Sequence, residues 1–327
     1  MTSKRFLAVV AAGFAAAVVT LVPLNMYADP YGLFRSSSAR SLPVYGEERI
    51  AKYLYALRYI PENFDGVLLG SSVSDNLDPR HFQAYRIYNA SINGGNVEDL
   101  SPIAGNIFGK SSLKLTIVCI HRYLTLDHAQ KTGLMNPREY WGALGSPQLL
   151  TVYLSELAVR RGIARSEYDG FGVLREGANP NIATVRRNID KAVAEIERGQ
   201  ASVGNYAIDG VALAELDRML SLARSRSERM LVFYPPVPAP VLAIRSAAYA
   251  RYRDTVRSLL RPGDAVVDFN ETSYSELRND LRNFQDAVHL SESGAALVMS
   301  ELSRTVVALD STGWGRPRVV AQAGREQ

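Results

Sequence analysis

A serine after a short apolar run and a distant aspartate–histidine pair carry the strongest chemical signal in this 327-residue chain. Val67-Leu68-Leu69 leads into Gly70-Ser71-Ser72, and Asp286 and His289 stand three residues apart far downstream. A turn after a strand presents a hydroxyl at the edge of a sheet, where N–H groups of a following helix can surround an anion. An adjacent aspartate can hold an imidazole in the tautomer that accepts a proton from serine. Together these residue types predict nucleophilic acyl chemistry.

Each half of this signal also has a purely structural interpretation. Glycine and serine are ordinary turn residues. Asp286 or Ser291 could cap the apolar helix that follows Gly294, with His289 packed in the turn before it. The combination of both halves favours the chemical interpretation, since a structural histidine needs neither an aspartate beside it nor a nucleophile-type turn upstream.

Short apolar runs alternating with helical periodicity would position these side chains. Strands buried on both faces of a parallel sheet are brief and continuously apolar, and five segments fit: 66–69, 86–88, 115–120, 230–234 and 265–269. Helical spacing covers 47–59, 182–196 with Gly199 as its stop, and 209–225. We predict one flavodoxin-like three-layer α/β domain with a mostly parallel central sheet and a helical insertion.

The N-terminal segment predicts a membrane anchor. Lys4 and Arg5 precede an uncharged stretch from Phe6 to Ala28, and about 20 apolar residues span a bilayer. Met26-Tyr27-Ala28 lacks a small-x-small cleavage pattern, which favours an uncleaved helix over a signal peptide. Positive charge on the N-terminal side predicts a single-pass protein of the inner (cytoplasmic) membrane, with its main domain in the periplasm or outside.

The predicted organisation is therefore an anchor at 1–28, a linker at 29–46, an α/β domain at 47–310 and a flexible tail at 311–327. Within the domain, we predict that residues from about 127 to 228 form the helical insertion.

Composition excludes several other classes of function. The net charge is +4, with Lys and Arg scattered among acids, so no nucleic-acid partner is expected. A single cysteine, Cys119, excludes an intramolecular disulfide. No Cys/His cluster has zinc-site spacing, so no metal is expected.

The chain resembles the SGNH hydrolase family, also called GDSL-like. Gly70-Ser71-Ser72 fits the Gly-Asp-Ser block with serine in place of aspartate, and Asp286 and His289 match the closing Asp-x-x-His. The resemblance implies Ser72 as nucleophile, with Asp286 and His289 completing a triad. It also implies an oxyanion hole, for which Ser72, Gly94 and Asn93 are candidates. The match runs in order from about 67 to 309 and leaves the insertion uncovered.

The chain departs from that family at the third block, Gly-x-Asn-Asp, whose asparagine completes the oxyanion hole. Here the third strand is followed by His121 and Arg122, with no asparagine. Asn93, Asn96, His121 or Arg122 could take its place. His121, Arg122 and Phe171 are also substrate-binding candidates, although the loop holding Phe171 could equally bind no ligand.

The resemblance implies two-step acyl transfer without a metal or organic cofactor. Membrane-anchored relatives that acylate cell-surface polymers share this layout. The resemblance therefore predicts a serine esterase or O-acyltransferase that acts on acyl groups of an extracytoplasmic polysaccharide or envelope polymer. Its expected partner is a membrane-embedded acyltransferase. The alternative is a catalytically inactive glycan-binding or scaffold protein of an envelope-assembly complex.

Overall fold

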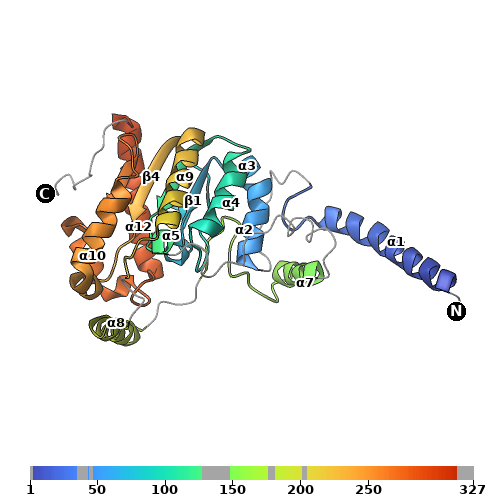
Figure 1. Ribbon diagram of the computed structural model, residues 1–327, viewed down its shortest axis with the longest axis horizontal. Coiled ribbons are helices and arrows are strands. Elements are labelled where there is room, and N and C mark those ends of the chain that lie inside the picture. The colour runs from blue at the N-terminus through green and yellow to red at the C-terminus, as the bar shows by residue number, and fades with distance from the viewer. Residues whose placement is uncertain are drawn as a thin grey trace.

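Five parallel strands form a central sheet in the order β2-β1-β3-β4-β5 (Figure 1). They are β1 Gly66–Leu69, β2 Ile87–Asn89, β3 Leu113–Cys119, β4 Ser227–Tyr234 and β5 Ala265–Asp268. This is the flavodoxin-like order, in which ligands bind beyond the carboxyl ends of the strands near β1 and β3. The computed structural model describes residues 3–34, 43, 47–126, 148–175, 181–200 and 205–314.

Helices cover both faces of the sheet, because successive strand residues point to opposite sides. Val67 and Leu69 join one buried cluster, and Leu68 joins the other. The first cluster is covered by α2 (Glu48–Leu57), α3 (Tyr59–Asn63), α4 (Val97–Phe108), α9 (Gly210–Arg226) and α10 (Ala239–Arg257). The second is covered by α8 (Ile182–Glu197) and α12 (Glu292–Thr312). The predicted fold class, a single α/β domain after one apolar helix, is confirmed.

Seven further helices complete the described chain. They are α5 (Tyr123–Leu126), α7 (Gln148–Arg160), α11 (Ser275–Asn279), and the 3-10 helices η1 (Ser72–Ser74), η2 (Pro79–His81), η3 (Thr272–Tyr274) and η4 (Leu281–Asn283).

The helix predicted over 47–59 ends earlier than expected, at Leu57, and a new helix begins at Tyr59. Arg58 between them has φ −151° and ψ −52°. A continuous helix would place Pro61 in its interior, where the ring clashes with the preceding turn. The break moves Pro61 into the first turn of α3, where no N–H is needed.

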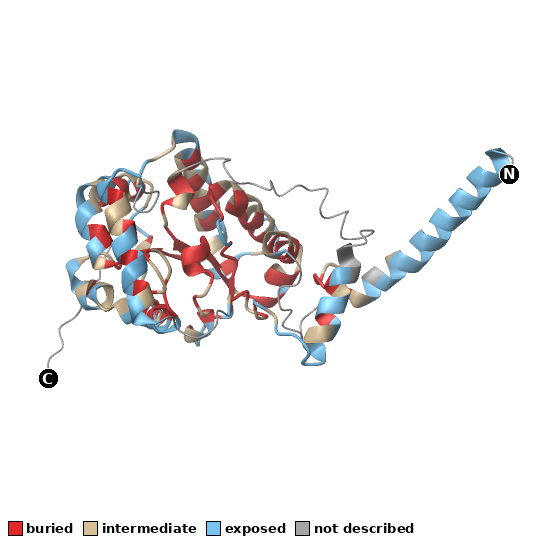
Figure 2. Cartoon of the chain, turned by 90° about the horizontal axis from the view of Figure 1, so that it is seen from below, coloured by how far each residue is buried: buried red, intermediate tan, exposed pale blue. Residues whose placement is uncertain are grey.

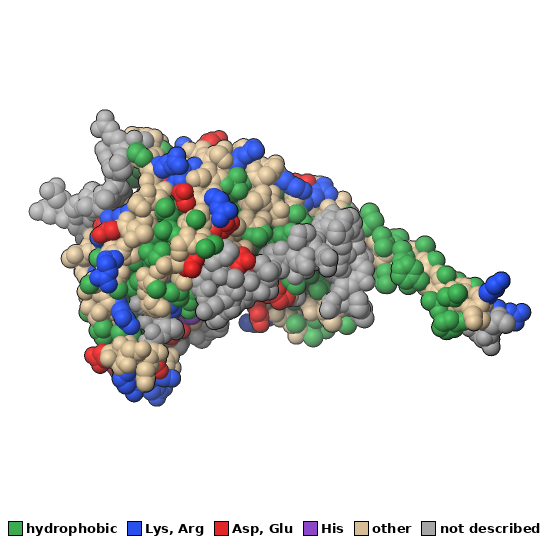
Figure 3. Space-filling view, viewed as in Figure 1, with side chains coloured by type: hydrophobic (Ala, Val, Ile, Leu, Met, Phe, Trp, Pro, Cys, Tyr) green, Lys and Arg blue, Asp and Glu red, His purple; other side chains and the backbone are tan. Residues whose placement is uncertain are grey.

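α1 (Ser3–Ala28) is long and apolar enough to cross a membrane, and none of it is buried against the domain (Figure 2). Figure 3 shows hydrophobic side chains along its length and basic ones at its outer end. Signal sequences share these properties, so retention of α1 stays a prediction.

The turn after α1 packs directly on the domain. Asp29 and Tyr31 are each only 6% exposed, and the Tyr31 ring lies 5.9 Å from that of Tyr55 in α2. The first residues of the predicted linker are therefore part of the packed domain. Residues 35–42, 44–46, 127–147 and, from the predicted tail, 315–327 lie outside the described residues.

Candidate active site

The chain turns sharply after β1 and presents Ser72. A Cβ on Gly70 would collide with Ser74 Oγ and lie 2.8 Å from the Cβ of Cys119, so only glycine fits at this position. The 3-10 helix η1 begins two residues later, with Ser72 as its first residue. Ser72 is 8% exposed, whereas Ser71 is fully buried. The local packing therefore turns Ser72, and not its neighbour, toward solvent.

A closed loop before α12 carries Asp286 and His289. The Gln285 N–H donates to the carbonyl of His289 at 2.9 Å, which closes the loop. Asp286 Oδ1 accepts from the N–H groups of Val288 and His289, both at 2.7 Å. Asp286 therefore shapes this loop. The N-cap of α12 is Ser291, whose Oγ accepts from the N–H of Gly294 at 3.1 Å.

The structure brings Ser72, His289 and Asp286 into one chain of hydrogen bonds. His289 Nε2 lies 3.1 Å from Ser72 Oγ, and His289 Nδ1 lies 2.9 Å from Asp286 Oδ2. Donation from Nδ1 to the carboxylate leaves Nε2 as the acceptor for the serine proton. The His289 side chain is 37% exposed, so a substrate can reach it from solvent.

Electrostatics keep Asp286 ionised. Burial acts to raise the pKa of Asp286, but the hydrogen bond and charge of His289, with the two loop N–H groups, outweigh it and lower the pKa below its ordinary value. A carboxylate that stays charged can stabilise an imidazolium at His289 during a reaction.

The turn after β2 lies beside the serine turn. Ser71 forms a parallel bridge with Ile92, and the Ile92 N–H donates to Gly70 at 3.1 Å. Gly94 has φ +64° and is exposed. Within the described residues no group accepts from the N–H of Ser72 or of Gly94. The Asn93 N–H, by contrast, donates to Glu48 at 3.2 Å.

His121 follows β3 and lies beside the turn that carries Ser71 and Ser72. Its Nδ1 lies 3.3 Å from Ser71 Oγ. Burial, and then the charges of Arg122 and His289, lower the pKa of His121 well below its ordinary 6.5, so the ring is neutral at pH 7.

The other candidates for the place of the missing asparagine are occupied elsewhere. Arg122 is 3% exposed, and its guanidinium lies 4.3 Å from the Tyr123 ring centroid. Asn96 caps α4 through the N–H of Asp99 at 3.1 Å. Among the sequence candidates, His121 is the one that the structure brings beside the serine turn.

Phe171 lies at the outer edge of the sheet. Its carbonyl accepts from the N–H of Asn89 at 2.8 Å, and its ring packs 5.7 Å from that of Phe64. The Arg80 guanidinium lies over the Phe171 ring, 5.4 Å from its centroid. These contacts engage the ring in packing, and its role in substrate binding stays a prediction.

Several buried polar residues support the site and were missed in the sequence. Asn89 Nδ2 donates to the carbonyls of Ser74 and Leu77 at 2.7 and 2.9 Å, which ties η1 to β2. Ser74 Oγ lies 2.9 Å from Ser91 Oγ. Lys52, fully buried, donates to the Ser91 carbonyl and pairs with Glu48 at 2.9 Å. The signal available in the sequence was an asparagine that ends an apolar strand, followed two residues later by a serine.

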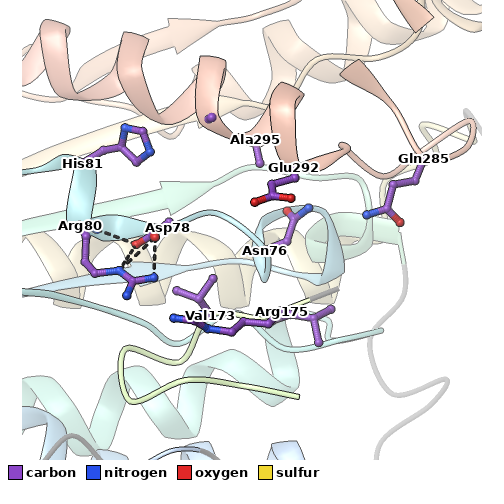
Figure 4. Close-up of a pocket in the computed structure, with 11 residues that line it drawn as sticks. Asn76, Asp78, Arg80, His81, Val173, Arg175, Gln285, Glu292 and Ala295 are labelled. Atoms are coloured by element: carbon purple, nitrogen blue, oxygen red, sulfur yellow. Dashed lines mark hydrogen bonds and ion pairs between the residues drawn. The ribbon is translucent and has the colours of Figure 1, made fainter. Parts of the chain in front are cut away.

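A cavity of about 320 Å³ adjoins the loop that carries Asp286 and His289 (Figure 4). Gln285 and Asn76 line it, and Asn76 Nδ2 donates to the Leu290 carbonyl at 2.9 Å. Gln285 lies at one end and the Arg80–Asp78 pair at the other, with Glu292 and Asn76 between them. No group of three or more His, Cys, Asp or Glu side chains in the described part of the chain could hold a metal.

Comparison with known proteins finds no matching family and no matching curated protein. Among solved structures, a protein from Streptococcus pneumoniae, provisionally described as a platelet activating factor, is 11% identical. It covers 80% of this chain and 91% of its own, with a TM-score of 0.41. A provisionally described acylhydrolase from Bacteroides fragilis is 13% identical, covering 76% of this chain and 86% of its own, with a TM-score of 0.35. Similarities of this size establish neither family nor activity.

Proposed function

We propose that this chain is a serine esterase or O-acyltransferase of the SGNH type. The observation that carries the proposal is the hydrogen-bonded series Ser72–His289–Asp286, in which Ser72 and His289 are 217 residues apart in sequence. A structural role for His289 would not require both of its ring nitrogens to face these particular partners.

The geometry supports two-step acyl transfer. Ser72 Oγ attacks an ester carbonyl carbon while its proton passes to His289 Nε2. The resulting imidazolium returns that proton to the leaving alkoxide as the ester C–O bond breaks. Water or a sugar hydroxyl then attacks the acyl-enzyme by the same route in reverse, and Asp286 stabilises the imidazolium in both steps.

We propose that three donors stabilise the negative charge that develops on the substrate oxygen. The N–H groups of Ser72 and Gly94 have no acceptor within the described residues. We assign His121 to the position of the family's missing asparagine. If Ser71 donates to its Nδ1, a neutral His121 carries its proton on Nε2 and can donate to the oxyanion.

For the substrate, we propose acyl groups of an extracytoplasmic polysaccharide or other envelope polymer. The cavity beside the catalytic loop has paired charges and amides, which suit sugar hydroxyls better than an acyl chain. α1 would hold the enzyme at the membrane, where a membrane-embedded acyltransferase could supply the acyl group.

The test uses the full chain in detergent with p-nitrophenyl acetate and a fluorophosphonate probe. Ser72→Ala should abolish both turnover and covalent labelling, and His289→Ala should abolish turnover. Ser71→Ala is the matched neighbour and should keep covalent labelling, but it should lower turnover, because His121 loses the hydrogen-bond partner of its Nδ1. Adding a glycan acceptor should raise p-nitrophenol release if transfer outcompetes hydrolysis.

The absent third-block asparagine favours a second candidate, an inactive glycan-binding or scaffold protein. A folded chain that neither turns over the ester nor reacts with the probe, yet binds glycan, would establish that candidate and refute the enzyme.

A further inference from the structure

α7 and the turn after it expose an apolar surface beside the membrane helix. Leu154, Leu157 and Ile163 are 57%, 43% and 76% exposed. Leu154, Leu157 and Arg161 recur at the three- and four-residue spacing that places them on one helix face. We call Leu154, Leu157 and Ile163, together with Arg161 and Arg165, the α7 surface.

The opposite face of α7 is already used. Val152 is 6% exposed and belongs to the main buried cluster. Tyr31, in the turn that follows α1, belongs to the same cluster, and burial, then the nearby Tyr153 and Glu47, raise the pKa of Tyr31 to about 12. Figure 1 shows α7 at the inner end of α1. The α7 surface is therefore close to the point where α1 leaves the domain.

The end of α7 makes the exposure of Ile163 unusual. Gly162 has φ +70°, its N–H donates to Val159, and the Ile163 N–H donates to Ala158, at 3.0 and 2.9 Å. This is the Schellman pattern, in which the residue after the glycine commonly packs back on the helix. Here that residue is isoleucine and points into solvent.

Basic side chains flank these apolar ones. Arg160 pairs with Glu156, but Arg161 and Arg165 are exposed and form no ion pair with any described residue. Glu167 is the one exposed acid between 160 and 167. Apolar side chains bordered by unpaired arginines match the interface of a bilayer containing anionic lipid.

We propose that the α7 surface rests on the anionic phospholipid surface of the bilayer that α1 crosses. Leu154, Leu157 and Ile163 enter the headgroup region, and Arg161 and Arg165 contact lipid phosphates. This second contact fixes the rotation of the domain about α1, and it does not depend on the proposed chemistry.

The test places the full chain in nanodiscs of phosphatidylcholine, with or without phosphatidylglycerol. Ile163→Cys is labelled with a polarity-sensitive fluorophore, and Cys119 stays unlabelled because it is fully buried. In discs with phosphatidylglycerol, nitroxide lipids should quench this label several-fold more than a label at Ser246→Cys, an exposed position on α10.

Charge reversal supplies the matched control. Arg161→Glu with Arg165→Glu should remove most of the quenching in phosphatidylglycerol discs. Arg186→Glu with Arg187→Glu, on the exposed face of α8, should not change it. Equal quenching at 163 and 246 would overturn the proposal. A blue-shifted label that lipid nitroxides do not quench would also overturn it, because protein, such as residues 127–147 or a partner, would then cover the surface.

Discussion

The two oxygens of Asp286 have separate roles. Oδ1 accepts from two N–H groups of its own loop, and Oδ2 faces His289 Nδ1. An asparagine could keep the first role through its carbonyl oxygen. Its NH₂ group would face Nδ1 and stabilise the tautomer that carries a proton on Nε2, which cannot accept the proton of Ser72.

We therefore expect Asp286→Asn to lower kcat by about 10⁴-fold, as the corresponding change does in a serine protease, with little change in thermal unfolding. Steady-state kinetics with p-nitrophenyl acetate, beside a melting curve, measures both. A variant that keeps most of its kcat would show that Asp286 only shapes the loop.

His121 should act in the transition state rather than in substrate binding. His121→Ala is expected to lower kcat by about 10²–10³-fold with little effect on KM, the loss typical of one oxyanion donor. His121→Asn restores the amide of the family pattern and should recover part of that loss. Equal defects in the two variants would instead indicate a packing role.

His121 also predicts how stability depends on pH. In the unfolded chain this histidine takes up a proton near its ordinary pKa of 6.5, but in the folded chain only at much lower pH. The unfolded state therefore binds more protons between the two values, and the free energy of unfolding falls as the pH decreases from 6.5. Urea unfolding at several pH values should show a shallower fall for His121→Gln than for the parent chain. Parallel curves would contradict this.

At this scale the sequence predicted the three side chains that the structure brings together, but not the residues that support them. Ser72, Asp286 and His289 stand in recognisable short patterns. The Ser71–His121 contact joins residues that follow two different strands, 50 positions apart, and no local pattern marks it.

Among the elements, α2 carries a charged pair that holds the turn beside the active site. Lys52 joins Glu48 of its own helix to the carbonyl of Ser91 after β2, and its ammonium lies 4.6 Å from the Tyr168 ring centroid. Both charges are almost entirely withdrawn from water, so removing one leaves the other buried and unpaired.

Lys52→Met should lower the free energy of unfolding by roughly 3 kcal/mol. The double variant Lys52→Met with Glu48→Gln should lose less than the sum of the losses of Lys52→Met and Glu48→Gln alone. Lys191→Met on α8 is the control, since its i,i+4 pair with Glu195 is exposed and worth at most about 1 kcal/mol. Urea unfolding measures all four variants. Similar losses for Lys52→Met and Lys191→Met would argue against a buried pair.

Comparison of these two ion pairs shows a feature of the helices that the sequence could not predict. Glu48–Lys52 and Lys191–Glu195 have the same spacing, and only packing against β2 and residue 168 distinguishes them. The five strands were recognisable because each contains a short apolar run. The helix break at Arg58 depends on Pro61, whose effect on a preceding turn is local and could have been anticipated.

For the whole molecule, retention of α1 is the testable expectation. Cleavage after Ala28 would place a charged amino group on Asp29, which is 6% exposed within the packed turn. Measurement of the intact mass should therefore show that the mature chain still contains residues 3–28. The chain should also resist extraction from membranes by alkaline carbonate. A mass starting at Asp29 would contradict this.

The overall layer arrangement could be predicted because chain order and apolar runs define a doubly wound sheet. The contact between α7 and the turn after α1 could not, because it joins residues more than 100 positions apart.

The buried turn at 29–32 also determines how far the proposed enzyme can reach. A long flexible tether would let a catalytic domain sweep a wide volume and dilute its effective concentration over that volume. If α1 crosses a bilayer as proposed, the buried turn joins it to the domain without slack, and Ser72 would stay at a nearly constant height above that bilayer. Polymer segments would be modified only while they pass through that layer, and their order of passage would then set the order of modification.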